Sequence, residues 1–310
     1  MSAIEFPLVK PGTLHESRLE TIWERARNQN DDGRTRAALD AIDKPEALAM
    51  LGAALQRMKL FEAAADCDRA NGLKISRETA ARIENVWIFS GVGTLRTPVK
   101  QPNPEKNYKA DNPALIKEFL QWGNRRRFLH GMLVAQRIAE ARSGKQLPGN
   151  LIGESAEDCK RAEAVRDSMR QYGPLITFGG FFQENDEAKK VRLCSSNGFP
   201  PEKFIIVEPA PGEPEWKTTA DQVKNFQTPP EVSGMTTALV SDDVHLNRIV
   251  HIAGKFHEYL PEARPLYLFP SALPEYGRPE YEGMELQGLL AYVYRDGVAA
   301  AEAYPHTLRR

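Results

Sequence analysis

Five short apolar runs, each three to five residues long, limit what this chain can fold into. Most of them end at glycines or at acidic and hydroxyl-bearing residues, and segments of helical pattern separate them. Continuous apolar runs of this length are typical of strands that are buried on both faces. Because strands alternate with helices, the sequence predicts an α/β protein with a Rossmann-like, doubly wound parallel sheet. The predicted strands cover residues 86–89, 175–178, 204–207, 238–240 and 265–269.

The pattern of apolar residues changes near residue 80. Residues 1–80 have helical spacing of apolar side chains and no residue that suggests chemistry, so we expect a helical N-terminal region that is a cap or an oligomer surface. Residues 81–310 form the predicted α/β domain, with polar, proline-rich insertions near 94–124 and 144–155. The first insertion is either a lid over the ligand or a tolerated surface loop. The helices expected between the strands span residues 128–141, 156–171, 187–195 and 244–259.

Composition excludes several classes of protein. The 310 residues carry a formal net charge of −1, so no global basic field favours nucleic acid or acidic membranes. Cys67, Cys159 and Cys194 are widely spaced and fit reduced thiols. No apolar leader and no stretch near ~18 apolar residues is present, so we expect a cytoplasmic protein without membrane insertion.

Glycines follow two of the predicted strands. Gly91 and Gly93 follow the first, and Gly179 and Gly180 close the second. Glycine lets a backbone approach a ligand closely, and open parallel sheets bind ligands beyond the carboxyl ends of their strands. The third glycine of a dinucleotide fingerprint is missing, which argues against an ordinary NAD site. The alternative is that both glycine pairs form tight turns.

The stretch from Ser241 to Arg248 is the most informative in the chain. The residues from Ser241 to Asp243 are expected to cap the following helix, and His245 falls in its first turn. Arg248 follows His245 by one turn on the same face. A histidine at a helix N-terminus is expected to stay neutral and able to accept a proton. An arginine there can bind an anionic group through two hydrogen bonds. The alternative is a capping turn with a surface histidine and arginine.

Other candidates rest on one feature each. Glu187 begins a predicted helix, Glu208 follows the third strand, and Thr219 lies at another helix start. Arg127 belongs to a local basic run and could reach a phosphate or a carboxylate. Zinc-protease, common esterase and P-loop motifs are absent from the sequence, and no His and Cys spacing predicts a metal site.

In their order along the chain these pieces resemble the SanA/YdcF-like family of bacterial proteins. The resemblance covers about residues 84–295. Within it, the sequence departs from the family pattern at Thr218, Asp221 and Gln222. Many relatives carry membrane helices, which this chain lacks. The matching segments are residues 88–93, 126–127, 176–180, 187–188, 198–208, 218–222, 241–248 and 285–289.

The resemblance implies a Rossmann-like fold and a ligand site, and it leaves the reaction open. We expect a small-molecule enzyme with an anionic or nucleotide-like ligand, in which His245 is acid or base beside Asp243 and Glu187. Ligand contacts would come from the glycines, Ser241, Thr219, Glu208 and two arginines, Arg127 and Arg248. The alternatives are a non-catalytic ligand-binding or envelope-related assembly factor and a transferase that binds S-adenosylmethionine. S-adenosylmethionine and Mg²⁺ are the cofactors left open, and a homo-oligomer is the oligomeric state left open.

Overall fold

The sheet is the centre of the molecule. The computed structural model describes residues 13–89, 123–147, 156–179, 200–209, 212–213, 216, 218–227, 229–260, 265–273 and 278–308. All strand pairs of the described sheet are parallel, and the strand order is β3-β2-β1-β4-β5-β6. The predicted Rossmann-like α/β fold is confirmed, and a short sixth strand extends the five that were predicted. The strands are β1 (Asn85–Phe89), β2 (Leu175–Gly179), β3 (Phe204–Val207), β4 (Thr237–Asp242), β5 (Leu266–Ser271) and β6 (His306–Leu308).

The central strands are buried on both faces, as their apolar sequences require. Every residue of β1, β4 and β5 is buried. Side chains alternate between two hydrophobic clusters, because successive residues of a strand point to opposite faces. Trp87 and Leu239 belong to one cluster, and Ile88 and Val240 belong to the other. The sheet therefore needs helices on both sides.

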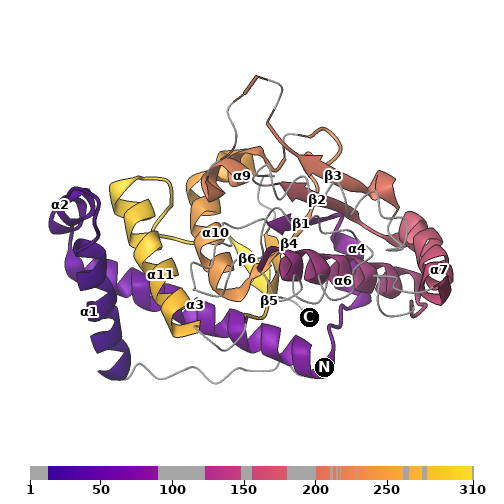
Figure 1. The fold of residues 1–310 in the computed structure, drawn as a ribbon, viewed down its shortest axis with the longest axis horizontal. Helices are drawn as coiled ribbons and strands as arrows, with labels where there is room; N and C mark the ends of the chain where they lie inside the picture. Colours follow the sequence, from indigo (N-terminus) through magenta and orange to yellow (C-terminus); the bar gives the residue numbers. More distant parts are fainter. Residues whose placement is uncertain are drawn as a thin grey trace.

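One face is covered by helices from both ends of the chain. These are α1 (Thr13–Arg27), α3 (Lys44–Asn71), α9 (Thr219–Asn225), α10 (Asp243–Lys255) and α11 (Arg278–Leu290), which continues as the π-helical turn Ala291–Arg295. Apolar residues of α1 and α3 share one cluster with β1, β4 and α10. Figure 1 shows α1, α3, α10 and α11 grouped on this side of the sheet. The short helix α2 (Arg34–Asp40) packs against the turn that follows α11.

The other face is covered by α4 (Arg77–Arg82), α6 (Gly123–Ser143) and α7 (Ala156–Tyr172). Helix α6 approaches β1 very closely at Gly131. A Cβ atom added to Gly131 would lie 2.3 Å from Ile88 Cγ1, so only glycine fits there without a shift. This close contact fixes the position of Arg127, one turn earlier on α6, relative to the carboxyl end of β1.

One predicted helix ends earlier than expected. The helix expected over 244–259 ends at Lys255, because Phe256 leaves the helical conformation and residues His257–Tyr259 form a separate 3-10 turn. The helix expected over 187–195 lies outside the described residues. None of the described helices is both long and apolar enough to cross a membrane.

Candidate functional site

The strand order reverses between β1 and β4. The chain proceeds from β1 outward to β2 and β3, and then returns to the other side of β1 to form β4. Open α/β sheets bind their ligands beyond the carboxyl ends of the strands at such a switch point. Here β4 ends at Asp242 and α10 begins at Asp243, so the predicted stretch from Ser241 to Arg248 lies at this point.

Asp242 forms a buried ion pair with Arg127. Its Oδ2 atom lies 2.7 Å from Arg127 Nε and 2.5 Å from Arg127 Nη2, and both side chains are almost completely buried. Asp242 occupies the N-cap position of α10 but makes no capping hydrogen bond with its side chain. The amide of Val244 instead donates to Asp243 Oδ1 at 2.8 Å. The N-cap residue Asp242 therefore does not make the expected side-chain cap, and Asp243, the first residue of the helix, accepts this first-turn amide.

Ser241 contacts His245 rather than the helix backbone. Ser241 Oγ and His245 Nδ1 are 3.1 Å apart, and the edge of the His245 ring meets Phe89 at a centroid distance of 5.8 Å. Burial lowers the pKa of His245 well below 6.5, and the positive charges of Arg248 and Arg127 act in the same direction. His245 is therefore neutral at pH 7. Its Nε2 atom is buried and has no hydrogen-bond partner among the described residues.

Asp243 pairs with an arginine that the sequence reasoning missed. Arg278, the first residue of α11, places Nη2 2.6 Å from Asp243 Oδ2 and Nε 3.2 Å from Glu62 Oε1. Burial raises the pKa of Asp243 to about 6, although Arg278 opposes the shift. Asp243 thus exchanges its proton near neutral pH, which is the range that an acid or base catalyst needs.

Arg248 lies against α11 and the turn that follows it. Its Nε atom is 3.1 Å from Glu285 Oε2, and its guanidinium lies 5.4 Å from the centre of the Tyr292 ring. Neither Arg248 Nε nor Glu285 Oε2 makes a hydrogen bond in the described part of the chain. The side chain of Arg248 is 16% exposed, against 6% for Arg127. Arg248 is therefore the more accessible and the less firmly bound of these two arginines.

His130 is a further residue of the site that was not predicted. It follows Arg127 by three residues on α6, so the two side chains share a face of that helix. Burial lowers the pKa of His130 to about 4, and the negative charge of Asp242 partly opposes this shift. The spacing of Arg127 and His130 was a signal in the sequence, but only the packing of α6 against β1 shows that it matters.

Three other predicted ligand contacts are among the described residues, and their proposed roles stay predictions. Glu208 is exposed beyond the edge strand β3, which β2 and β1 separate from β4, roughly 14 Å at the usual strand spacing. Thr219 is buried in the first turn of α9, where Thr218 and Asp221 form the capping box. At Gly179 a Cβ atom would lie 3.3 Å from the ring of Trp216, so this glycine allows close packing.

Four predicted contacts cannot be placed. Gly91, Gly93, Gly180 and Glu187 lie outside the described residues, and their proposed roles stay predictions. In the part of the chain that is described, no three His, Cys, Asp or Glu side chains lie close enough together to hold a metal ion.

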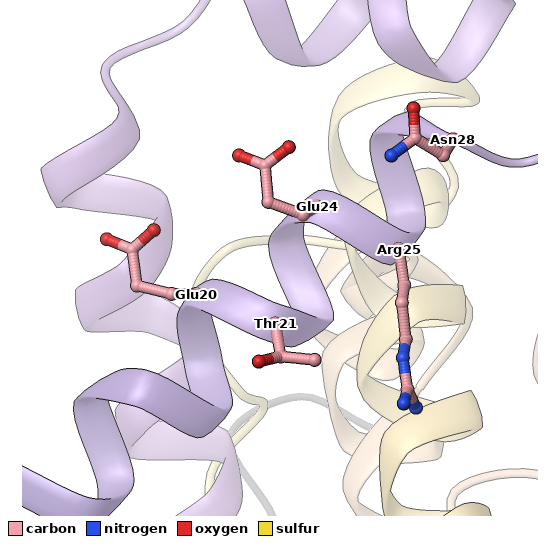
Figure 2. Close-up of a pocket in the computed structure, with 5 residues that line it drawn as sticks. All are labelled: Glu20, Thr21, Glu24, Arg25 and Asn28. Atoms are coloured by element: carbon pink, nitrogen blue, oxygen red, sulfur yellow. The ribbon is translucent and has the colours of Figure 1, made fainter.

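A hollow on the surface of α1 lies far from this chemistry. Figure 2 shows its five side chains, which come from α1 and the turn that follows it. All five residues are exposed, and Glu20 is paired with Lys44 at 2.6 Å. The hollow contains no buried ionisable group. Its lining residues are Glu20, Thr21, Glu24, Arg25 and Asn28.

Comparison of the chain with models of protein families, with curated proteins and with solved structures finds no match.

Proposed function

We propose that this protein is a small-molecule enzyme that binds an anionic or nucleotide-like ligand at the carboxyl ends of β1 and β4. The observation that supports this most is the concentration of buried ionisable side chains there. His245 and His130 have pKa values shifted down by burial, and the pKa of Asp243 is raised to about 6. Perturbed pKa values cluster at functional sites, because burial and neighbouring charges are arranged there to tune reactive groups. The resemblance to the SanA/YdcF-like family is part of the same proposal.

His245 is the proposed acid or base. Its Nδ1 atom is engaged with Ser241, which orients the ring, and this leaves Nε2 for the ligand. Asp243, held by Arg278, precedes it by two residues at the start of α10. A neutral imidazole can accept a proton in the reaction and return it later.

Arg248 is the proposed contact for the charged end of the ligand. Its pairing with Glu285 lacks a hydrogen bond, so a ligand carboxylate or phosphate that offers two oxygens would bind it better. Arg127 has a different role in this proposal, because its buried pairing with Asp242 holds the end of β4 in place.

The test compares affinity and rate in variants. Mass spectrometry of small molecules that copurify with the protein identifies the ligand to be used. His245→Ala should lower turnover by roughly 10²–10⁴-fold with a small change in affinity. Arg248→Ala should mainly weaken binding, and Arg248→Lys should restore part of the loss. The exposed His257, just beyond the end of α10, provides the control variant His257→Ala, which should behave as wild type.

A non-catalytic binding or assembly factor is the alternative that the same variants test. Each carboxylate at the switch point already faces an arginine, an arrangement that also suits a site built to hold a ligand. In that case both alanine variants shift affinity and no turnover is found. A transferase that binds S-adenosylmethionine would need an acid for the ribose hydroxyls, and the exposed position of Glu208 beyond the edge strand does not favour that contact.

A further inference from the structure

Two buried imidazole nitrogens at the switch point have no partner within the described residues. They are Nε2 of His245 and Nε2 of His130. His245 is only 3% exposed, and His130 is half-buried as a residue although its Nε2 atom is shielded from solvent. A buried polar atom without a hydrogen bond costs roughly 1–3 kcal/mol, so native proteins rarely keep one without a reason. Two such atoms at one switch point indicate a bound group.

Both imidazoles flank the same ion pair. His130 shares a face of α6 with Arg127, and His245 lies in the first turn of α10, three residues after Asp242. The charge of Asp242 raises the pKa of His130, and the charge of Arg127 lowers that of His245. The two rings therefore lie within electrostatic range of one central pair, one on the α6 side and one on the α10 side.

The charges around the imidazoles are already balanced. Asp242 faces Arg127 and Asp243 faces Arg278, with N to O distances of 2.5 and 2.6 Å. A charged ligand group placed beside the imidazoles would lose its hydration without gaining an unpaired counter-charge. An uncharged hydroxyl avoids this cost. It can donate to one ring nitrogen and accept from the other, or accept from both, so it fits every pair of tautomers in which at least one Nε2 atom carries a proton.

We propose that His245 and His130 bind an uncharged hydroxyl group of the ligand, while its acidic group stays at Arg248. This inference rests on the proposed function and narrows its ligand to molecules that carry both an acidic group and hydroxyls, as nucleotides and sugar phosphates do. Inorganic phosphate and acids without hydroxyls would use only half of the site.

Matched probes test this without knowledge of the natural ligand. The probes are AMP, 2′,3′-dideoxy-AMP and ribose 5-phosphate, with dissociation constants measured by calorimetry. We expect wild-type protein to bind dideoxy-AMP at least tenfold more weakly than AMP. In His245→Ala and in His130→Ala the ratio between these two probes should fall toward one, because the group that distinguishes them is gone. The exposed-histidine control His257→Ala should keep the wild-type ratio, and a cooperative thermal transition checks that each variant is folded.

The outcomes separate the two proposals. If AMP and dideoxy-AMP bind wild-type protein equally well, the hydroxyl site is wrong and the proposed anionic or nucleotide-like ligand stands. If the ratio persists in both alanine variants, other residues bind the hydroxyls and the inference is again wrong. If none of the three probes binds, the nucleotide-like form of the proposed function is wrong together with the hydroxyl site. Should one histidine variant fail to fold, the other gives the same measurement.

Discussion

Replacement of Arg278 by methionine is the sharpest test of how the site is held together. Methionine keeps most of the length and the apolar contacts of arginine but removes its charge. Arg278 is 8% exposed in its side chain and lies 2.6 Å from Asp243, whose side chain is fully buried. Removing one partner of a buried ion pair typically costs about 3–5 kcal/mol, because the remaining charge is left uncompensated. That is a large part of the ~5–15 kcal/mol that a typical domain has in total.

The loss should depend on pH with a definite sign. Burial raises the pKa of Asp243 to about 6 in the native state, against ~3.9 in an unfolded chain. The native state therefore binds more protons between these values, and the contribution of Asp243 to stability falls as the pH rises through this window. Without Arg278 the native pKa of Asp243 should rise further, so the loss continues above pH 6. At pH 5 the carboxyl of Asp243 is neutral and needs no cation, so Arg278→Met should lower the free energy of unfolding only slightly at that pH.

The assay is urea unfolding of four proteins at pH 5 and pH 8. They are wild type, Arg278→Met, Asp243→Asn and the double variant. We expect Arg278→Met to cost about 3–5 kcal/mol at pH 8 and at least ~2 kcal/mol less at pH 5. In the Asp243→Asn background the cost at pH 8 should be small. The control Arg18→Met removes a partly exposed pair with Glu282 and should cost the same at both pH values. A cost of Arg278→Met that is equal at both pH values would refute the role assigned to Asp243.

Two further predictions concern packing and acid sensitivity. Gly131→Ala should cost ~1–3 kcal/mol of unfolding free energy, because its Cβ would lie 2.3 Å from Ile88, whereas Gly283→Ala on α11 meets open space and should gain ~0.5–1 kcal/mol. Equal effects in urea unfolding would contradict this. Burial lowers the pKa of His251 to about 4, and its Nδ1 lies 2.9 Å from the Ala300 carbonyl oxygen. Since the unfolded chain takes up this proton first, stability should fall by up to about 3 kcal/mol between pH 6.5 and 4, and His251→Gln should flatten that fall.

The strands and the switch-point stretch could be predicted because their signals are local. A buried parallel strand has to be apolar along its whole length, so β1 and β4 are visible as runs of sequence. Helical spacing alone puts His245 and Arg248 on one face of α10. The strand β6 could not be found in this way, because His306–Leu308 is short, only partly buried and not an apolar run.

The partners of the site residues could not be predicted because they come from distant parts of the chain. Asp242 and Arg127 are separated by 115 residues, and no local pattern brings them together. Asp243 was expected to face the ligand, but its pairing with Arg278 depends on where α11 packs. Sequence reasoning identifies which side chains could do chemistry. The packing of helices on the sheet decides which of them meet, and it brings Arg127, a predicted anion contact, against Asp242.

The N-terminal helices are connected to the site by charge as well as by packing. Ion pairs run from α1 and α3 through α11 to the first residue of α10, in the order Arg18, Glu282, Lys59, Glu62, Arg278 and Asp243. Partly exposed pairs such as Lys59–Glu62 add little stability by themselves. The buried end is different, because Arg278 is the cation that faces Asp243, and Glu62 of α3 helps to hold its guanidinium. Through Glu62 the N-terminal helices therefore take part in positioning the cation that faces Asp243.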